Sequence, residues 1–265
     1  SAIGKKMVSV HCIGLKVSFD PVDRSDLFWL LDSGIDFSRV ILYFTRPDAP
    51  ITPAAAETLN RRGVKFICMN RHAARLTKAP VWIPSLRIIG IGVTLAIEVT
   101  KSLLPSIATG DCRQAQYCLK LWRLFAGYIY WQDFFLAQNV VLDFNMMSYS
   151  SNFIGKHLAL HALNGVSVGY QLSSGFYPSV EILPAPDVQF VFSATDNELW
   201  NLYQSPVLQF VQTGYIYDKA FDFVREQAKQ RRNHLMKKGA KFIICFLDEN
   251  SSEDRNMFFR HEQAM

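Results

Sequence analysis

The first 70 residues decide the fold, and they open with a short apolar run that reads Lys6-Met7-Val8-Ser9-Val10-His11-Cys12-Ile13-Gly14. This run predicts a buried strand, as do two later apolar runs at residues 40–45 and 64–69. Helices are expected between them, at residues 25–31 and 53–63, and the second has a proline in its first turn and a glycine at its end. The order strand–helix–strand–helix–strand is typical of a parallel sheet with right-handed crossovers.

The same alternation resumes in the second half of the chain. Strands are expected at residues 140–144, 166–172, 187–193 and 207–215, and helices at residues 152–163, 196–203 and 221–238. Asp196 is the expected N-cap of the second of these helices. We therefore predict an α/β fold, a Rossmann-like parallel sheet flanked by helices, over residues 1–239. Residues 240–265 are expected to supply the opening strand, at 241–247, and the opening helix of a second Rossmann-like domain.

The middle of the chain interrupts this alternation with an inserted helical pair at about residues 86–138. A basic, proline-containing linker at 71–85 leads into helices expected at 88–104 and 111–138. The second helix carries two adjacent apolar stripes: Ala115, Cys118, Trp122, Phe125 and Ile129, and Leu121, Leu124, Tyr128, Trp131 and Phe135. Such a helix is either sandwiched between layers of the protein or partly inserted in a membrane interface. We favour burial, because core aromatics at helical spacing are the commoner case. In the first helix the longest uncharged stretch is 88–97, too short for the ~20 residues of a membrane span.

Composition excludes several classes of protein. The 265 residues are 49% hydrophobic, which suffices for a core and excludes a disordered chain. Lys and Arg number 28 against 23 Asp and Glu, an excess too small for a dedicated nucleic-acid binder but suited to an anionic ligand or an anionic membrane face. The five cysteines are scattered without a Cys-x-x-Cys pair, which favours a reducing compartment over a disulfide or zinc scaffold. The N-terminus lacks the apolar segment of a signal peptide.

Polar side chains lie at the ends of most of the expected strands, where ligands bind in an open α/β sheet. Asp143 stands at the end of the fourth strand, where it could act as a base or a nucleophile. The candidate substrate-binding residues at the same edge are Lys16, Asp20, Asp23, Arg24, Asn145, Gln171, Ser173, Ser174 and Tyr215. Ser251 and Ser252 begin the last expected helix, whose backbone N–H groups could hold a donor diphosphate. Taken singly, each of these residues also fits an ordinary polar turn, whereas the set as a whole favours a site.

Several other motifs fail on spacing. Gly90-Ile91-Gly92 lacks the third glycine of a dinucleotide fingerprint. His157 and His161 share a helix face without the glutamate of a zinc peptidase, and no tight acidic pair is present, so no metal is predicted. The turn at residues 171–175 lacks the first glycine of a nucleophile elbow, which argues against a serine hydrolase. His11 lies inside the first strand and is expected to be a hydrogen-bonded core histidine.

The order of several short motifs resembles a known family. The opening part comprises residues 11–21, Asp23-Arg24-Ser25-Asp26 and Asp32-Ser33-Gly34-Ile35-Asp36. It resembles the N-terminus of bacterial surface-polysaccharide biosynthesis proteins. Residues 171–175, the strand at 190–192 and Thr213-Gly214-Tyr215 are similar to a later part of the same half. These proteins are glycosyltransferases of the GT-B type, with two facing Rossmann-like domains, and include capsule, O-antigen and Kdo transferases. The resemblance covers about residues 8–250.

The resemblance implies that the chain is the acceptor-side half of a glycosyltransferase, which transfers a sugar from a nucleotide-activated donor to a growing bacterial surface polysaccharide. The nucleotide sugar and a glycan or lipid-linked acceptor would be its substrates, with no further cofactor, no metal and no nucleic acid. Such an enzyme works in the cytoplasm or at the inner face of the inner membrane, where an anionic membrane surface is a candidate partner. Residues 240–265 would be only the start of the donor domain, so this chain alone is expected to be inactive.

The sequence departs from one branch of these proteins. The polyol-phosphate polymerases carry Trp-His-Gly at the turn where this chain has Leu172-Ser173-Ser174-Gly175. Without that histidine, Asp143 is the better candidate for the catalytic group. The sequence leaves two alternatives open. One is a non-catalytic module that binds a sugar or docks on a polysaccharide-assembly complex. The other is peripheral attachment to a membrane through the helix expected at 111–138.

Overall fold

The computed structural model describes most of the chain, and the fold is built from those residues. They are 4–12, 17–19, 25, 27, 30, 33–45, 52–77, 79–110, 112–145, 151–171, 183–215 and 218–244. Contacts divide the chain into two compact units, residues 1–220 and 221–265. The first unit contains the whole sheet.

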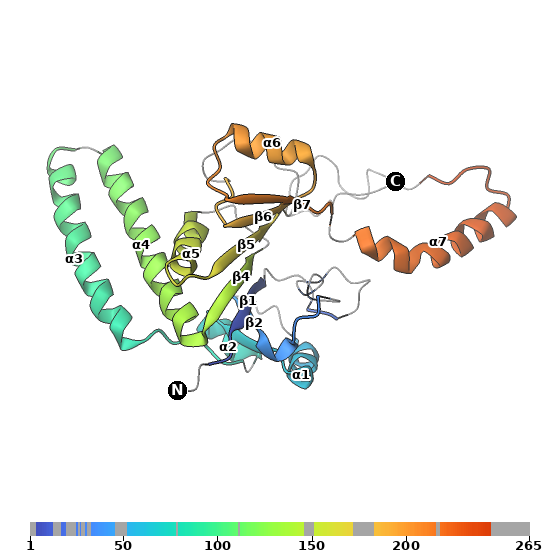
Figure 1. The fold of residues 1–265 in the computed structure, drawn as a ribbon, viewed down its shortest axis with the longest axis horizontal. Coiled ribbons are helices and arrows are strands. Elements are labelled where there is room, and N and C mark those ends of the chain that lie inside the picture. Colours follow the sequence, from blue (N-terminus) through green and yellow to red (C-terminus); the bar gives the residue numbers. More distant parts are fainter. Residues whose placement is uncertain are drawn as a thin grey trace. The chain divides into compact units, whose positions relative to one another are not determined.

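Seven parallel strands form a single sheet in the first unit (Figure 1). They are β1 (Met7–Cys12), β2 (Val40–Phe44), β3 (Lys65–Cys68), β4 (Val140–Asn145), β5 (Val166–Tyr170), β6 (Val188–Val191) and β7 (Gln209–Gln212). Their order is β3-β2-β1-β4-β5-β6-β7. The chain therefore builds outward from β1 to one edge and then returns to place β4 on the other side of β1. This reversal is the topological switch point of a doubly wound fold, and it confirms the predicted Rossmann-like sheet.

The helices confirm most of the sequence predictions. They are the short 3-10 helix η2 (Phe37–Arg39), α1 (Pro53–Arg61), α2 (Arg71–Thr77), α3 (Leu86–Ala108), α4 (Cys112–Gln138), α5 (Ser151–His161), α6 (Ala194–Leu202) and α7 (Lys219–Lys237). Thr52 caps α1, since its side chain accepts a hydrogen bond from the backbone N–H of Ala55. The inserted helical pair is present as α3 and α4.

Two local predictions were wrong. Residues 71–85 were expected to be a linker, but their first half forms α2, whose start is stabilised by the Asn70 side chain accepting from the backbone N–H of His72 at 2.8 Å. Asp196 is not the N-cap of α6. Ser193 holds that position, and its hydroxyl and the Asp196 carboxylate each accept the other's backbone N–H in a capping box.

The alternation of side chains along the strands produces two cores, one on each face of the sheet. Val10, Leu42 and Phe44 pack against Leu59 of α1 on one face. The other core joins the sheet to α4 and α5 and contains Ile41, Tyr43, Ile67, Phe134, Phe135, Val140, Ala159 and Leu160. The second face carries the candidate site described below.

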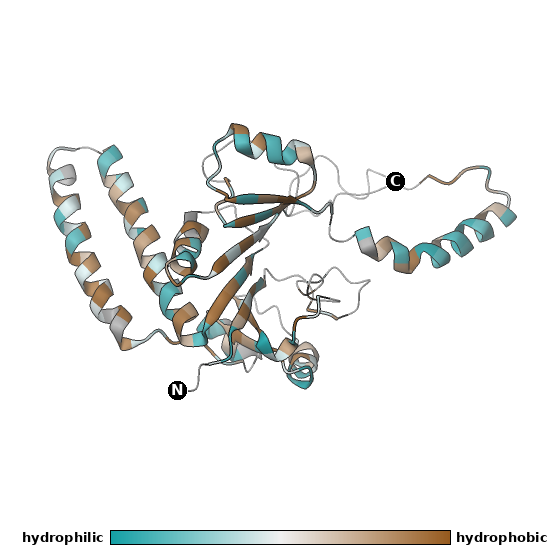
Figure 2. Ribbon diagram, viewed as in Figure 1, coloured by the Kyte–Doolittle hydropathy of each residue, from teal (hydrophilic) through white to brown (hydrophobic). Residues whose placement is uncertain are grey.

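The predicted burial of residues 111–138 holds only for the C-terminal half of α4. Phe134 and Phe135 are buried, but Tyr117, Leu121 and Phe125 in the first half are exposed. α3 packs against α4, and α4 packs against α5. Figure 2 shows that apolar residues continue along both helices of this hairpin. Within the described residues, no helix is long and apolar enough to cross a membrane.

The second unit contains most of α7, which was expected to close the first domain. Gly239 follows it with a φ of +95°, a left-handed conformation that glycine adopts without strain. Residues 241–244, the described part of the strand expected at 241–247, are not in a strand. The rest of the proposed second Rossmann-like domain, residues 245–265, lies outside the described residues.

The close approach of α5 to α4 gives a test of this packing. A Cβ added at Gly155 would lie 2.8 Å from the backbone oxygen of Leu124 and 3.0 Å from the backbone nitrogen of Tyr128. Because backbone atoms of a packed helix cannot rotate away, we expect Gly155→Ala to lower the free energy of unfolding by about 1–3 kcal/mol. Urea unfolding followed by circular dichroism measures the change.

Gly92→Ala is the matched control, because Gly92 lies in α3 with nothing within 4 Å of the added Cβ. Alanine there should stabilise the helix by about 0.5–1 kcal/mol. Equal unfolding midpoints for the two variants would contradict the described packing of α4 on α5.

Candidate functional site

The strand register brings polar side chains together at the centre of the sheet. In β1, Ser9 and His11 alternate with apolar residues and therefore share one face. Ser9 is in register with Asp143 of β4, and His11 is in register with Asn145 of β4 and Tyr43 of β2. Tyr43 belongs to the core beneath α4 and α5, so this polar row lies on that side of the sheet, next to the switch point.

A buried ion pair links this row to α5. Lys156 Nζ lies 2.9 Å from Asp143 Oδ2, and both side chains are only 1% exposed. Ser9 donates to Asp143 Oδ1 at 2.6 Å, and the Tyr43 hydroxyl donates to Oδ2 at 3.3 Å. Lys156 also donates to the Tyr43 hydroxyl at 2.7 Å. These bonds are necessary because a buried charge is stable only when it is paired and hydrogen-bonded.

The surroundings shift the titration of both partners of this carboxylate. Burial lowers the pKa of Lys156 from its usual value, and the attraction of Asp143 opposes that effect. Burial raises the pKa of Tyr43 well above its usual value, and the Asp143 charge raises it further. Tyr43 therefore stays a protonated phenol at neutral pH and can donate and accept a hydrogen bond at the same time.

Three aromatic rings surround the Lys156 ammonium. Its Nζ lies 5.1 Å from the centroid of Phe153, 5.4 Å from that of Tyr43 and 5.7 Å from that of Trp131. Ring faces attract a cation at such distances, and the attraction is larger away from water. The rings thus compensate part of the hydration that Lys156 loses on burial.

His11 is buried and neutral. Burial has the largest effect on its pKa, and the repulsion of the Lys156 charge adds to it. Together they lower the pKa of His11 to about 3. Its Nδ1 lies 2.8 Å from Oδ1 of Asn145, so Nδ1 carries the proton and donates it. Nε2 is then an acceptor for the Thr45 hydroxyl, 2.9 Å away. The expectation of a hydrogen-bonded core histidine is confirmed, but His11 also faces a cavity.

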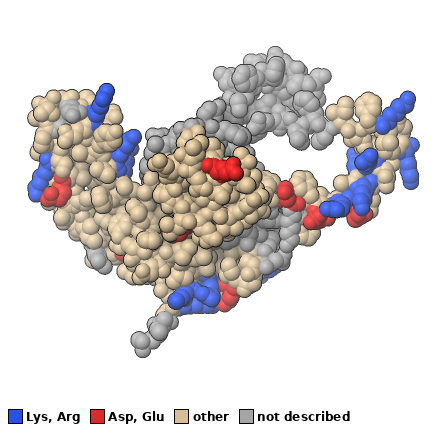
Figure 3. Space-filling view, turned by 45° about the horizontal axis from the view of Figure 1, so that its top comes forward, with Lys and Arg blue, Asp and Glu red and all other residues tan. Residues whose placement is uncertain are grey.

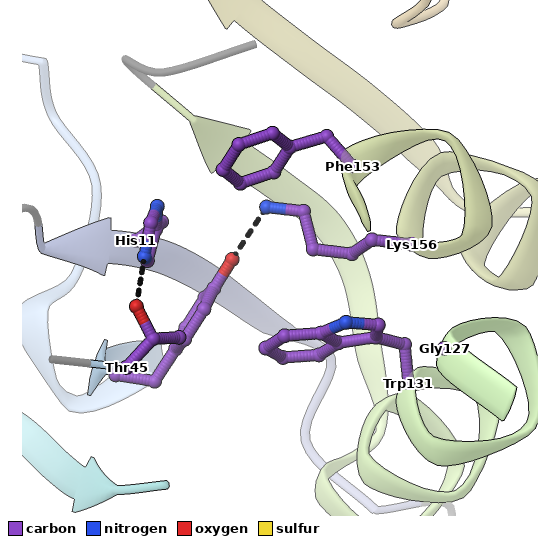
Figure 4. Close-up of a pocket in the computed structure, with 7 residues that line it drawn as sticks. His11, Thr45, Gly127, Trp131, Phe153 and Lys156 are labelled. Atoms are coloured by element: carbon purple, nitrogen blue, oxygen red, sulfur yellow. Dashed lines mark hydrogen bonds between the residues drawn. The ribbon is translucent and has the colours of Figure 1, made fainter. Parts of the chain in front are cut away.

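The cavity has a volume of about 270 Å³ and lies near the carboxyl ends of β1 and β2 (Figure 4). α5 contributes Lys156 and Phe153, and α4 contributes Trp131 and Gly127, as the close-up shows. The remaining lining residues are His11, Tyr43 and Thr45. The walls therefore combine aromatic faces with a hydroxyl, an imidazole, a phenol and an ammonium group.

Asp143 and Asn145 are the two sequence-predicted residues that the structure places beside this cavity. Asp143 contacts Tyr43 and Lys156 from their buried side, and both of its oxygens are hydrogen-bonded. This geometry suits a positioning role better than the predicted role of base or nucleophile. Asn145 is fully buried and orients His11.

Two other predicted residues serve elsewhere in the structure. Gln171 follows β5 and joins two elements, since its amide donates to Asp196 at 2.9 Å and its oxygen accepts from the backbone N–H of Phe192 at 3.1 Å. Tyr215 packs its ring edge-on against Phe192. The other candidates lie outside the described residues: Lys16, Asp20, Asp23, Arg24, Ser173, Ser174, Ser251 and Ser252.

Five residues of the site were not predicted from the sequence: Lys156, Tyr43, Thr45, Trp131 and Phe153. A signal for Lys156 was present, because it lies on the same helix face as Phe153 and Leu160, three residues after one and four before the other. A lysine on an apolar helix face indicates a buried partner. In the described part of the chain, no three His, Cys, Asp or Glu side chains are grouped so that they could hold a metal ion.

Comparison of the chain with protein-family models, with curated proteins and with solved structures found no match.

Removal of Lys156 tests the buried ion pair. Lys156→Met leaves the Asp143 carboxylate buried without a cation, and we expect the free energy of unfolding to fall by about 3–5 kcal/mol. Lys156→Met with Asp143→Leu removes both charges and should recover a large part of that loss. The control is Lys101→Met, which breaks an exposed ion pair with Glu98 and should change stability by less than about 1 kcal/mol. If Lys156→Met were as stable as the wild type in urea unfolding, the pairing of Lys156 with Asp143 would be refuted.

The two buried histidines predict how stability depends on pH. Burial, followed by the repulsion of Lys156, lowers the pKa of His157 to about 3, and His11 behaves in the same way. The unfolded chain takes up these protons near pH 6.5 and the folded protein does not, so stability falls as the pH drops below about 6.5. At pH 5 each of these histidines should lower the free energy of unfolding by about 2 kcal/mol.

The variant His157→Leu isolates one of these contributions. Neither ring nitrogen of His157 has a hydrogen-bond partner among the described residues, so leucine removes no bond seen in the structure. Between pH 7 and pH 5 it should lose roughly 2 kcal/mol less stability than the wild type. His72→Gln, at an exposed position on α2, should follow the wild-type curve. Urea titrations at both pH values measure this, and parallel curves for wild type and His157→Leu would exclude the effect.

Proposed function

We propose that this chain is the acceptor-side domain of a bacterial surface-glycan glycosyltransferase, and that its cavity binds one sugar ring. The observation that carries the proposal is the combination of aromatic rings and hydrogen-bonding groups in a small cavity beside the switch point of the sheet. Doubly wound folds bind their ligands at this place. The resemblance of residues 8–250 to the glycosyltransferases supports the same assignment.

The size and walls of the cavity favour a single sugar. Its volume of about 270 Å³ lies just below the range of about 300–1,000 Å³ that drug-sized ligands occupy, so it suits one ring and not a whole nucleotide sugar. The C–H face of a sugar ring can pack on the rings of Trp131 and Phe153. Its hydroxyl groups can exchange hydrogen bonds with Thr45, His11 and Tyr43, all of which line the cavity.

The charge balance favours an uncharged ring over a phosphate at this position. The cation of Lys156 is balanced by Asp143 at 2.9 Å, so the cavity has no surplus positive charge. In the proposed enzyme, the donor diphosphate is held by other residues, with Ser251 and Ser252 as the candidates. The donor is a nucleotide sugar and the acceptor is a glycan or a lipid-linked glycan.

A non-catalytic sugar-binding or docking module is the second candidate, and a specific observation favours it. The groups in and beneath the cavity are poor bases, because both oxygens of Asp143 are hydrogen-bonded and His11 has a pKa of about 3. Sugar binding is common to both candidates. Transfer of sugar from a nucleotide donor to an acceptor, assayed on the full-length protein, distinguishes them.

We propose that the protein works in the reducing cytoplasm, either free or at the inner face of the inner membrane. The five cysteines are scattered along the sequence without a Cys-x-x-Cys pair. This supports a compartment in which thiols stay reduced.

Thr45→Val tests sugar binding with little change of shape. Calorimetric titration with a panel of monosaccharides and nucleotide sugars should show saturable binding of at least one sugar to the wild type. The substitution removes one cavity hydroxyl, which also donates to His11, and should weaken binding by roughly 3- to 10-fold, the value of one hydrogen bond. Thr100→Val, on the exposed surface of α3, should bind as the wild type does. The proposal would be refuted if the wild type bound no ligand of the panel, or if Thr45→Val bound the sugar as tightly as the wild type does.

A further inference from the structure

Lys156 differs from the other lysines whose side chains the structure describes, because it is buried and they are exposed. Its side chain is 1% exposed, whereas that of Lys101 on α3 is 66% exposed and that of Lys229 on α7 is 62% exposed. Figure 3 shows the usual position of Lys and Arg side chains, on the surface of the molecule. A lysine is rarely buried in this way, so its surroundings indicate what it could do.

The amine of Lys156 lies at the wall of the cavity. Figure 4 shows its side chain extending from α5 between Phe153 and Trp131 toward the strands. In the described part of the chain, two groups bind its Nζ: Asp143 Oδ2 at 2.9 Å and the Tyr43 hydroxyl at 2.7 Å. An ammonium group has three N–H donors, so one is left for a molecule in the cavity.

The surroundings of Lys156 also favour a reactive amine. Burial lowers its pKa, although the Asp143 charge opposes this effect. Inside a protein, the neutral amine avoids the desolvation cost of the ammonium ion. A neutral amine is a nucleophile, and desolvated lysines form imines with carbonyl compounds. The hydrogen bond to Asp143 provides an acceptor for the departing proton without any movement of the chain.

We propose that Lys156 forms an imine with a small hydroxylated aldehyde or ketone that enters the cavity. One proton of the ammonium group first moves to Asp143, which leaves a neutral amine. The nitrogen lone pair then attacks the carbonyl carbon. A C–N bond forms, and the electron pair of the C=O π bond moves to the oxygen.

Tyr43 is placed to carry the remaining protons. Its hydroxyl accepts a hydrogen bond from Lys156 at 2.7 Å and donates one to Asp143 at 3.3 Å. It first takes a proton from the nitrogen and gives its own to the oxygen, which becomes a hydroxyl group. The proton held by Asp143 then follows the same route to that hydroxyl group. Water leaves with the electron pair of the C–O bond, and the nitrogen lone pair forms the C=N bond of a protonated imine.

The protonated imine suits the site as well as the ammonium group does. It carries one positive charge on the same nitrogen, so the ion pair with Asp143 persists. The ring centroids of Phe153, Tyr43 and Trp131 lie between 5.1 and 5.7 Å from Nζ, and they attract this cation in the same way. The neutral amine is therefore needed only in passing.

The cavity also limits the carbonyl compound. Its volume of about 270 Å³ suits a short chain, and Thr45 and His11 can exchange hydrogen bonds with hydroxyl groups on that chain. The inference goes beyond the proposed function. It uses the same cavity, but it requires neither the binding of a sugar ring nor the transfer of a sugar.

Reductive trapping tests the inference on the wild-type protein. The probe is glycolaldehyde, a small hydroxylated aldehyde, and sodium cyanoborohydride converts an imine into a stable amine. Peptide mapping by mass spectrometry compares the adduct at Lys156 with those at Lys101 and Lys229 in the same sample. At limiting aldehyde, Lys156 should be labelled at least about tenfold more than either exposed lysine. Unfolding the protein in urea before labelling should abolish this preference.

Tyr43→Phe keeps the ring and removes the hydroxyl group. It should slow the labelling of Lys156 by about tenfold or more, and leave that of Lys101 unchanged. Tyr117→Phe, at an exposed position on α4, is the matched control and should be labelled as the wild type is. An equal rate in Tyr43→Phe would overturn the proton route through Tyr43.

The inference itself would be overturned if the folded wild type were labelled at Lys156 no more than at Lys101 and Lys229. It would also be overturned if the preference for Lys156 persisted in urea. Its failure is distinguishable from failure of the proposed function. A chain that binds a sugar in calorimetry but traps no aldehyde at Lys156 contradicts only the imine, and the reverse result contradicts only the sugar site.

Discussion

The buried ion pair between Lys156 and Asp143 is the interaction on which the described site depends. Two charges inside the protein are stable only if each is paired and its remaining hydrogen-bonding capacity is satisfied. That requirement fixes the register of β1 against β4, because Ser9 must reach Asp143, and it fixes α5 above the sheet. The Tyr43 hydroxyl is then hydrogen-bonded to both charged groups, and the aromatic rings close around the ammonium group.

The same network explains how a small cavity persists in a packed sheet-and-helix layer. Lys156 and His11 are held by hydrogen bonds on their buried sides, and each presents a further edge to the cavity. The site is therefore polar and close to neutral in charge, and aromatic rings form part of its walls. These properties support the proposal of an uncharged, polyhydroxylated ligand. The long helix α4 joins this cavity to the hairpin that it forms with α3.

The parts of the fold that depend on local pattern could be predicted from the sequence. The apolar runs, the proline at the start of α1 and the order of strands and helices suffice for the parallel sheet. The site could be predicted only in part. Asp143 and Asn145 were identified from their place at a strand end, but the partner of Asp143 is Lys156, which only the tertiary packing of α5 brings near. The exposure of α4 could not be predicted, because an apolar stripe has the same sequence whether a protein layer or a lipid surface covers it.

The central claim is that the cavity binds a sugar ring. The most direct test follows the tryptophan indole N–H signals by nuclear magnetic resonance while the wild-type protein is titrated with monosaccharides and nucleotide sugars. Trp131 lines the cavity, and Trp122 lies on the same helix at an exposed position outside it. If the cavity binds a sugar ring, one sugar will shift the Trp131 signal saturably and leave the Trp122 signal in place. A saturable ligand that leaves Trp131 unchanged, or a Trp131 signal that responds to no sugar, would contradict the account.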